Sequence, residues 1–489
     1  MRYVSTRGNL EKSYSAAEAI REGMVPGGGL FVPESFPKFT LDEINSLKKL
    51  NYQEVSIEVL KKYLSDYTEE EIKECVEGAY SDINFSHKER TPVVKVEDEV
   101  YVMELWHGPT AAFKDMALQL MPRLFVKARE KTNAVDDTLI LVATSGDTGK
   151  AALEGFKNLK GIKVVVFYPE EGVSQVQKLQ MITTEGDNLT VSALKGNFDD
   201  CQTGVKDIFS DEEFNSILKG LELSSANSIN LGRLLPQVIY YFKAYAQMLR
   251  DNEITLGEKV DFCVPTGNFG NILAGYYAME MGLPVGKLIC ASNKNNVLTD
   301  FLQSGTYDKK RDFHKTMSPS MDILVSSNLE RFLYHTLGDA DKVSKIYERF
   351  NRDGVFSIEK QELENIQNIM ESGYTDEDMC IDTIKNVFEN DNYIMDTHTS
   401  VAMNVALRKK TERKVVVLST ASIYKFPSSV LRSFGKQGET EFKEIEMLNE
   451  ITGVELHSAV KGIDKLPVLH KNCIEKDGMK EFLENLIKK

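Results

Sequence analysis

Short apolar runs alternate with amphipathic segments through much of the chain, and this alternation predicts a parallel α/β sheet covered by helices on both faces. The runs have the length of single strands, as in TLILVA at residues 138–143. Apolar residues at helical spacing follow several of them. The predicted strands are residues 138–143, 162–168, 260–265, 287–291 and 414–419. The predicted helices are residues 150–159, residues near 173–184 and a helix that begins at Asn271.

The first part of the chain has a different pattern, in which apolar residues recur at helical spacing over 42–50 and 52–64. A length of 489 residues exceeds one hydrophobic core, so we expect more than one domain. Two domains are predicted, a mainly helical N-terminal domain at 1–95 and a catalytic domain at 96–489. Within the catalytic domain we expect a small subdomain at about 140–235 and a charged helical insertion at about 338–392.

The charge balance argues against nucleic acid as a partner. The chain has 59 basic and 74 acidic residues, a net charge of −15, and no basic stripe. An anionic substrate therefore needs a locally positive pocket. No apolar run approaches the roughly 20 residues that span a bilayer, so no membrane partner is expected.

The cysteines and histidines show no metal or disulfide pattern. The six cysteines are scattered singly, without C-x-x-C, and the seven histidines include no H-E-x-x-H. The N-terminus has no charged head followed by an apolar core, as a signal peptide would. We expect a reduced, cytoplasmic protein without a metal ion.

Three loops that follow predicted strands carry residues suited to an anion. They are TSGDTG at 144–149, TGNFGN at 266–271 and STAS at 419–422. Glycines allow close backbone approach, and a helix N-terminus donates N–H groups. In open α/β sheets, ligands bind at this carboxyl edge. Each loop by itself is equally typical of a capped turn.

The first of these loops is not a nucleotide-triphosphate loop. That motif needs glycine six positions before its lysine, and Thr144 stands there before Lys150. The next residue is Ala151 instead of Ser or Thr. A carboxylate or phosphate site remains as the functional interpretation.

Two further segments carry candidate chemistry. Lys114 lies in WHGPTAAFKD among Ala111, Ala112 and Phe113. Desolvation by such neighbours lowers the pKa of an amine and favours the neutral nucleophile that Schiff-base chemistry needs. A lysine that reaches solvent from a helix start is the ordinary alternative. The segment NSINLGR, ending at Arg233, offers amide, hydroxyl and guanidinium groups that suit a phosphate.

Together these segments resemble one family, threonine synthase of the longer type with an added N-terminal domain. HGPTAAFKD, ATSGDTGKAA, SANSINLGRLLPQ and PTGNFGNILAG occur in the family's order, and the resemblance extends over nearly the whole chain. Four motifs in order are far more specific than any one of them. The resemblance implies an α/β fold of the tryptophan-synthase-β-like class, fold type II of the pyridoxal-phosphate (PLP) enzymes. That class has two parallel-sheet subdomains.

The resemblance also implies how PLP is held. Lys114 would bind the cofactor covalently through its amine and act as the catalytic base. Thr420 would hydrogen-bond the pyridine nitrogen, and a neutral hydroxyl there would leave that nitrogen largely unprotonated. The cofactor phosphate would lie against Gly267, Asn268, Phe269, Gly270 and Asn271.

The substrate implied by the resemblance is O-phospho-L-homoserine. A PLP-dependent lyase would eliminate its phosphate from Cγ and add water at Cβ to give L-threonine, the last step of threonine biosynthesis. The substrate carboxylate would lie against Ser145, Gly146, Asp147 and Thr148. The substrate phosphate would meet Thr148, Asn227, Ser228 and Arg233.

The sequence departs from the family pattern at one place, where Ser422-Ile423 stand in the usual position of His-Pro. A structural role is the interpretation for His398 in DTHT. Two alternatives stay open: another fold-type-II enzyme such as a serine or threonine dehydratase, and a non-catalytic threonine-synthase-like binding protein. A dehydratase has no need for the phosphate-binding segment that ends at Arg233. The sequence leaves monomer and homodimer equally open.

Overall fold

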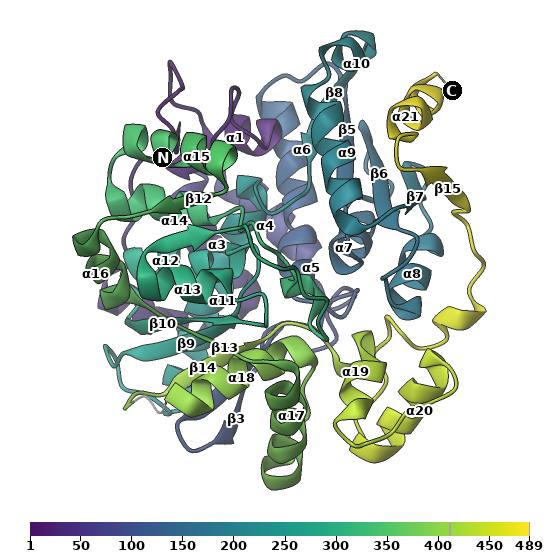
Figure 1. Ribbon diagram of the computed structural model, residues 1–489. Coiled ribbons are helices and arrows are strands. Elements are labelled where there is room, and N and C mark those ends of the chain that lie inside the picture. Colours follow the sequence, from purple (N-terminus) through teal and green to yellow (C-terminus); the bar gives the residue numbers. More distant parts are fainter. Residues whose placement is uncertain (410–411, 489) are drawn as a thin grey trace.

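Two sheets form the framework of the protein in the computed structural model, which describes residues 1–409 and 412–488 (Figure 1). The larger sheet has six strands in the order β13-β10-β9-β14-β4-β3, and only the β3–β4 pair is antiparallel. Its strands are β3 (Val93–Glu97), β4 (Val100–Glu104), β9 (Val260–Pro265), β10 (Val285–Ser292), β13 (Met370–Tyr374) and β14 (Val415–Ser419).

The smaller sheet has five strands, all parallel, in the order β15-β7-β6-β5-β8. Its strands are β5 (Asp137–Ala143), β6 (Ile162–Pro169), β7 (Leu189–Lys195), β8 (Leu221–Ser225) and β15 (Asn472–Glu475). Strand β15 comes from far outside residues 140–235. In Figure 1 the yellow C-terminal segment runs alongside this sheet to reach β15.

Strand β5 shows why both faces of the small sheet are covered. Leu139 and Leu141 pack into one apolar cluster, and the alternate residues Ile140 and Val142 pack into another. Successive side chains of a strand point to opposite faces, so an unbroken apolar run places apolar groups on both. The parallel α/β class with two sheets is therefore confirmed, and the predicted strands 138–143, 162–168, 260–265, 287–291 and 414–419 correspond to β5, β6, β9, β10 and β14.

The N-terminal region is mainly helical, as predicted. Capping boxes at Ser15, Thr40, Asn51 and Thr68 start its helices, because each side chain accepts a bond from the backbone N–H three residues on. The helices are α1 (Ala16–Glu22), α2 (Leu41–Leu47), α3 (Tyr52–Tyr63) and α4 (Glu69–Ala79). The N-terminal region also contains a small antiparallel pair, β1 (Tyr3–Ser5) with β2 (Phe31–Pro33). A second antiparallel pair, β11 (Thr306–Asp308) with β12 (Val355–Ser357), lies later in the chain.

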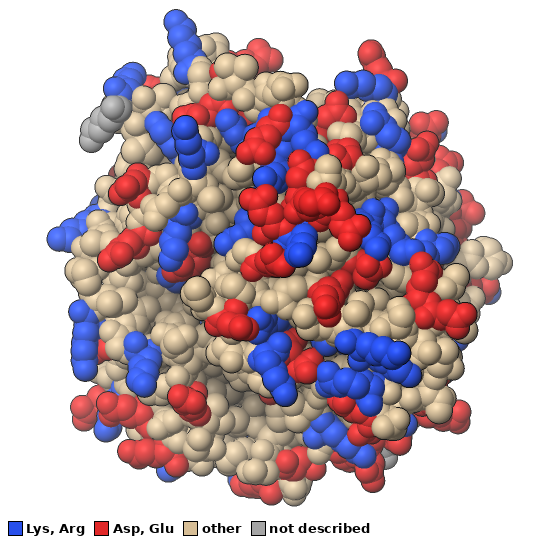
Figure 2. Space-filling model, turned by 180° about the vertical axis from the view of Figure 1, so that it is seen from behind, with Lys and Arg blue, Asp and Glu red and all other residues tan. Residues whose placement is uncertain are grey.

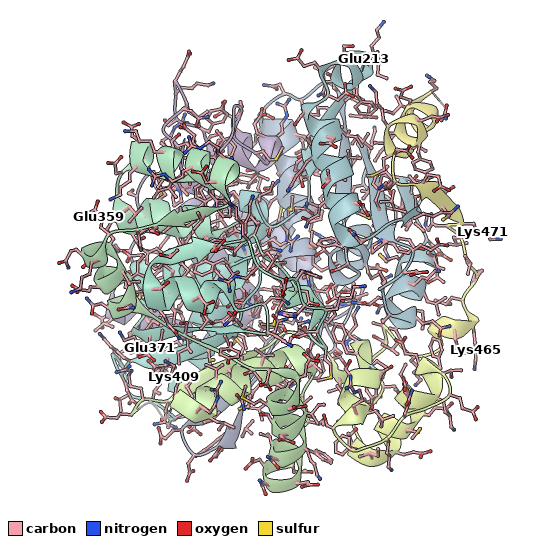
Figure 3. All side chains as sticks on the ribbon, in the orientation of Figure 1. Glu213, Glu359, Glu371, Lys409, Lys465 and Lys471 are labelled. Carbon is pink, nitrogen blue, oxygen red and sulfur yellow. The ribbon has the colours of Figure 1, made fainter. Side chains whose placement is uncertain are left out.

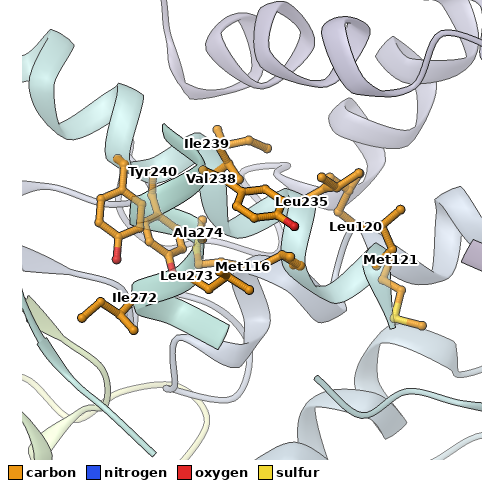
Figure 4. Packing of buried hydrophobic residues seen from close by; sticks show 14 of the residues in the cluster. Met116, Leu120, Met121, Leu235, Val238, Ile239, Tyr240, Ile272, Leu273 and Ala274 are labelled. Carbon is orange, nitrogen blue, oxygen red and sulfur yellow. The ribbon is translucent and has the colours of Figure 1, made fainter. Parts of the chain in front are cut away.

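Helix α11 (Leu231–Arg250) lies at the centre of the molecule, and all its residues from Leu231 to Leu249 are buried. It packs against α3, α5 (Lys114–Leu118) and α12 (Gly270–Glu280). Figure 4 shows Leu235, Val238 and Ile239 among the side chains of this cluster. A helix that is buried all round needs partners on every side. This helix therefore joins the N-terminal region to the elements that carry Lys114 and the 266–271 loop.

The remaining helices cover the sheets and fill the periphery. They are α6 (Met121–Lys131), α7 (Asp147–Phe156), α8 (Gln175–Ile182), α9 (Phe198–Ser210), α10 (Glu212–Ile217), α13 (Val297–Ser304), α14 (Leu329–Leu337), α15 (Ala340–Asp353), α16 (Lys360–Ile369), α17 (Glu377–Asp391), α18 (Thr397–Lys409), α19 (Pro427–Arg432), α20 (Glu441–Thr452) and α21 (Met479–Ile487). Three short 3₁₀ helices are η1 (Pro319–Met321), η2 (Ile423–Lys425) and η3 (Ile463–Lys465).

The segment 338–392 contains the predicted helices but also two strands. Strand β13 pairs with β10 and forms one edge of the larger sheet. Its sequence, MESGY, has no apolar run that would predict a strand. As an edge strand it pairs with one neighbour only, and only two of its five side chains are buried.

Charged side chains are interspersed over the surface, as seen on the face in Figure 2. The labelled charged residues of Figure 3 lie at the outside of the molecule, where Lys409 meets Glu371 at 3.1 Å. Within the described ranges, no helix is both long enough and apolar enough to cross a bilayer.

Candidate active site

The candidate site lies where strands of both sheets end. The loops after β4, β5, β8, β9 and β14, together with the first residues of the helices that follow them, hold the residues predicted to bind the cofactor and the substrate. Carboxyl ends of parallel strands meet at one edge of a sheet, which is where open α/β folds bind ligands. The structure therefore brings together segments that are up to three hundred residues apart in the chain, such as Lys114 and Thr420.

Backbone hydrogen bonds fasten the lysine loop to the end of β14. Leu105 N–H donates to Ser419 O at 2.9 Å, and Phe113 N–H donates to Thr420 O at 2.8 Å. Ser422 N–H then donates to the carbonyl of Ala111 at 3.0 Å. Lys114 begins α5 directly after this ladder, so its position relative to Thr420 is set by backbone bonds.

A buried carboxylate fixes the loop from its other side. Asp115 accepts from Thr110 N–H at 2.8 Å and from Thr110 Oγ1 at 2.7 Å. Gly108 leaves the room for this side chain, because a Cβ there would lie 2.6 Å from Asp115 Oδ2. The loop before Lys114 is thus rigid, which suits a group that must meet a ligand in one geometry.

The carboxylate of Asp147, at the start of α7, is shared between two lysines. Its Oδ1 lies 3.0 Å from Lys425 Nζ and accepts from Gln177 Nε2 at 2.8 Å. Its Oδ2 lies 3.4 Å from Lys114 Nζ and 3.5 Å from Ser320 Oγ. Burial alone would raise the pKa of Asp147, but the ammonium groups of Lys425 and Lys114 and the amide of Gln177 hold it well below its usual value.

Lys114 is only 12% exposed, and the charged groups around it are Asp147, Arg233 and Lys425. Burial lowers the pKa of its amine, Asp147 opposes this effect, and the charges of Arg233 and Lys425 lower it further. The predicted desolvation of Lys114 is therefore present, although its cause is the whole pocket and not only the neighbouring alanines.

The 266–271 loop bonds its carbonyls within the protein and leaves a run of backbone N–H groups without an acceptor in the described structure. Its carbonyls face away, since Gly267 O accepts from Ser326 Oγ at 2.8 Å and Asn268 O accepts from Asn328 N–H at 3.1 Å. Phe269 makes the turn possible with a φ of +63°, the left-handed conformation. Among the residues described, the amides of 267–271 have no acceptor within the protein. Such a nest binds a phosphate dianion.

Arg233 supplies a buried cation near Lys114, whose pKa its charge lowers. It is 3% exposed, its Nη1 donates to Ala226 O at 2.6 Å, and its Nε has no partner in the part of the chain described. Burial lowers the pKa of Arg233 to about 10. Ser228 lies close to the nest, because its Cβ is 3.9 Å from where a Cβ on Gly270 would stand.

Comparisons with known proteins identify the family of this chain. Residues 2–80 match the family described as Threonine synthase N terminus, and residues 85–421 match the family described as Pyridoxal-phosphate dependent enzyme. The chain is 39% identical to a threonine synthase of Pseudomonas aeruginosa, over 88% of this chain and 90% of that protein. The chain belongs to the threonine synthase family of PLP-dependent enzymes.

Solved threonine synthase structures share the whole fold. A PLP-bound threonine synthase from Brucella melitensis has a TM-score of 0.89 at 34% identity, with 100% of this chain and 99% of that chain covered. Human Threonine synthase-like 1 is 39% identical over 99% of this chain. The chain spans only 66% of the length of that human relative.

The site fits PLP, the cofactor of this threonine synthase family. The nest amides suit the cofactor phosphate, and Asn271 Nδ2 is buried without a partner in the described structure. Gly267 lets the backbone of the Ser320 loop come close to the nest, because a Cβ there would lie 3.0 Å from Ser320 O. Thr420 is 6% exposed at the end of β14, next to the lysine loop.

The SGDT loop lies beside Lys114, and the side chain of Asp147 contacts Lys114 and Lys425. Only its backbone N–H, at the start of α7, is suited to a substrate carboxylate. Gly146 has a φ of +137°, and Gln177 fills the space beside it. Ser145, Asn227 and Ser228 are half-buried at loop positions, and Thr148 is half-buried in the first turn of α7.

His398 supports the site without facing a ligand. Its Nε2 accepts from Ser320 N–H at 3.1 Å, so its Nδ1 carries the proton and donates to Asp396 Oδ2 at 2.7 Å. Nε2 thus holds the loop that carries Ser320, and Nδ1 fixes the ring against Asp396.

Sequence reasoning missed Lys425, Gln177 and Ser320 as contacts of Asp147. Gln177 reads as the third residue of a capping box with Ser174, and it does cap α8 as well. Lys425 has apolar neighbours in Tyr424 and Phe426, as Lys114 has in its own segment, but nothing in the sequence places it against Asp147. Within the described ranges, no group of His, Cys, Asp and Glu is placed to hold a metal ion.

Proposed function

We propose that the protein is a threonine synthase, a PLP-dependent lyase that converts O-phospho-L-homoserine and water into L-threonine and phosphate. The observation that carries this proposal is Arg233, whose guanidinium is buried near Lys114 with its Nε unpaired in the described structure. Burying a cation without a counter-ion is costly, so a dianion that reaches the pocket gains strongly from meeting it. The nest accounts for one phosphate, and Arg233 supports a second.

The roles of the other residues follow from their places in the site. Thr148, Asn227 and Ser228 would complete the substrate phosphate site with Arg233. Ser145, Gly146 and the backbone of Asp147 and Thr148 would receive the substrate carboxylate at the start of α7. Gly267, Asn268, Phe269, Gly270 and Asn271 would hold the cofactor phosphate, and the Thr420 hydroxyl would donate a hydrogen bond to the cofactor ring nitrogen.

When bound, PLP supplies an electron sink that stabilises negative charge on the substrate carbon it activates. Lys114 carries the cofactor and is also the base in this proposal. Its amine would remove the proton from Cα and give it up to the bound cofactor before it takes a second proton from Cβ, which allows phosphate to leave Cγ. The amine would then deliver one proton to Cγ and one to Cα. Water adds OH at Cβ and its remaining proton goes to the departing phosphate, so all atoms of substrate and water appear in threonine and phosphate. An amine with a lowered pKa suits these transfers near neutral pH.

A cytoplasmic location belongs to the same proposal. All cysteines in the described structure are free thiols, five of them buried, which is typical of a reducing compartment.

A second candidate is a PLP-binding protein that does not form threonine. The human relative that aligns with 99% of this chain is named Threonine synthase-like 1, a name that states likeness rather than the reaction. The paired lysines at Asp147 and the buried Arg233 support turnover over this candidate.

The test is the release of phosphate and the formation of L-threonine from O-phospho-L-homoserine. We expect equal amounts of both products, and their loss in Lys114→Ala. Arg233→Ala should weaken use of the phosphorylated substrate by at least about tenfold, with PLP binding retained. A protein that binds PLP but forms neither product would refute the proposed reaction and leave the second candidate.

A further inference from the structure

The two oxygens of Asp147 have different surroundings. Oδ1 faces inward, where Lys425 Nζ lies at 3.0 Å and Gln177 Nε2 at 2.8 Å. Oδ2 faces the pocket, where Lys114 Nζ lies at 3.4 Å and Ser320 Oγ at 3.5 Å. The inner oxygen therefore has two close donors, and the outer oxygen has longer contacts that leave it free to respond to Lys114.

Lys425 is locked behind Asp147. Its side chain is 0% exposed, whereas that of Lys114 is 12% exposed. Its ammonium also donates to Gln180 Oε1. The amide of Gln180 is itself fixed, because its Nε2 donates to Ala459 O at 3.1 Å. This enclosure leaves no route by which a substrate would reach Lys425.

A fully enclosed lysine beside a carboxylate needs an explanation, because burying an ion pair is costly and does not by itself add stability. Lys425 is also too deep for direct contact with a substrate. Its effect on the site must therefore pass through Asp147, the carboxylate that it shares with Lys114.

We propose that Lys425 is a positioning residue: its charge keeps Asp147 ionised and directs Oδ2 at Lys114, whether or not Lys114 carries a proton. This inference rests on the proposed role of Lys114 as cofactor lysine and base. Such a base alternates between charged and neutral forms. Without Lys425, a neutral Lys114 would leave Asp147 as a buried anion with no cation in contact.

Lys425 also acts on Lys114 directly, by repulsion. The charged groups that face Lys114 are Asp147 from α7, Arg233 from α11 and Lys425 from η2. The groups around Lys425 include Asp147 and, further off, Asp115, Lys150 and His457. Without the Lys425 charge, Lys114 would be the one cation in contact with Asp147 among the described residues. The positive form of the Lys114 nitrogen would then become more favourable.

The test is a pH titration of the visible absorbance of the PLP-loaded protein, which reports the protonation of the Lys114 nitrogen without any turnover. In Lys425→Met and Lys425→Gln the midpoint should rise by about one pH unit or more. In Asp147→Asn it should fall, because the positive nitrogen loses its counter-ion.

Lys150→Met is the matched control. Lys150 is another nearly buried lysine of the same region, but it bonds Glu154 at 2.6 Å and Thr184 at 2.9 Å and makes no contact with Asp147. Its removal should leave the midpoint unchanged. Far-ultraviolet circular dichroism checks that each variant is folded.

The outcomes separate this inference from the proposed function. Borohydride reduction and peptide mapping of the wild type test whether PLP is attached to Lys114, and attachment elsewhere overturns the role of Lys114. If PLP is on Lys114 but either Lys425 variant keeps the wild-type midpoint, the positioning role is wrong. If neither Lys425 variant folds, the Asp147→Asn titration decides, and an unchanged midpoint there also overturns the inference.

Discussion

Phe113 donates its backbone N–H to the carbonyl of Thr420 at 2.8 Å, so the lysine loop and the end of β14 are held together without any side chain. A substitution of the Thr420 side chain should therefore leave this connection intact. Such a substitution removes only the contact that the Thr420 hydroxyl makes with a ligand.

Thr420→Val tests this separation, because valine has the shape of threonine without its hydroxyl. We expect normal folding and PLP attachment, with kcat lowered about tenfold by the loss of one hydrogen bond to the cofactor. Steady-state kinetics and the absorbance of the loaded protein measure both. A variant with wild-type kcat would show that the hydroxyl does not contact the cofactor.

Gly267→Ala should weaken PLP binding. A Cβ at this position would lie 3.0 Å from Ser320 O and so displace backbone beside the nest. At Gly270 the nearest atom to an added Cβ is 3.5 Å away, an ordinary contact. Equilibrium titration with PLP should give a dissociation constant about tenfold higher for Gly267→Ala, and a smaller change for Gly270→Ala. The reverse order of the two effects would contradict this geometry.

Arg331→Met should destabilise the whole protein. Arg331 is fully buried and donates to Phe31 O at 2.8 Å, Asn328 Oδ1 at 2.6 Å and Ile229 O at 2.5 Å. Methionine fills similar space but leaves three buried acceptors unpaired. The free energy of unfolding should fall by about 3 kcal/mol or more, measured by urea denaturation.

The control for this variant is Arg352→Met, because Arg352 is an exposed residue that pairs with its neighbour Asp353. Its stability should stay within about 0.5 kcal/mol of wild type. Equal effects of the two substitutions would show that the buried contacts of Arg331 are not what stabilises the fold.

Asp115 should make stability depend on pH. Burial raises the pKa of its carboxyl to about 7, although the bonds from Thr110 lower it. An unfolded aspartate has a pKa of about 4, so between about pH 4 and 7 the folded state holds a proton that the unfolded state has lost. Stability therefore falls as pH rises through this window.

Asp115→Asn has no such proton to lose. The wild type should therefore lose stability relative to this variant as pH rises from about 4 to 7, so its urea midpoint minus that of the variant should decrease. Measuring the difference cancels the other titrating groups. A difference that stays constant over this range would show that Asp115 has the same pKa folded and unfolded.

The fold could be predicted where the local pattern and the environment agree. Strand β9 matches its predicted range because both its faces are buried by helices, which makes the apolar run continuous. Strands β13 and β15 could not be predicted, because each lies at a sheet edge and carries charged or small residues there. Their assignment depends on a neighbour far away in the chain.

The site shows the same division. The glycine loops have sequence signals because the backbone itself makes the contact, as at Gly267 and Phe269. The importance of Lys425 has no such signal, because it depends on the folding of η2 against α7 and α8. Lysine side chains are mostly exposed in folded proteins, and only the packing of elements that are distant in the chain buries this one.

Strand β15 also imposes an order on folding. It pairs with β7, yet β7 ends at Lys195 and β15 begins at Asn472. While the intervening residues are being synthesised, the outer edge of β7 has unpaired N–H and C=O groups that can pair with another chain. Closing so long a loop is also slow. The small sheet must therefore wait, with an exposed edge, until the chain beyond residue 472 has emerged, and this interval is when the protein most needs protection from aggregation.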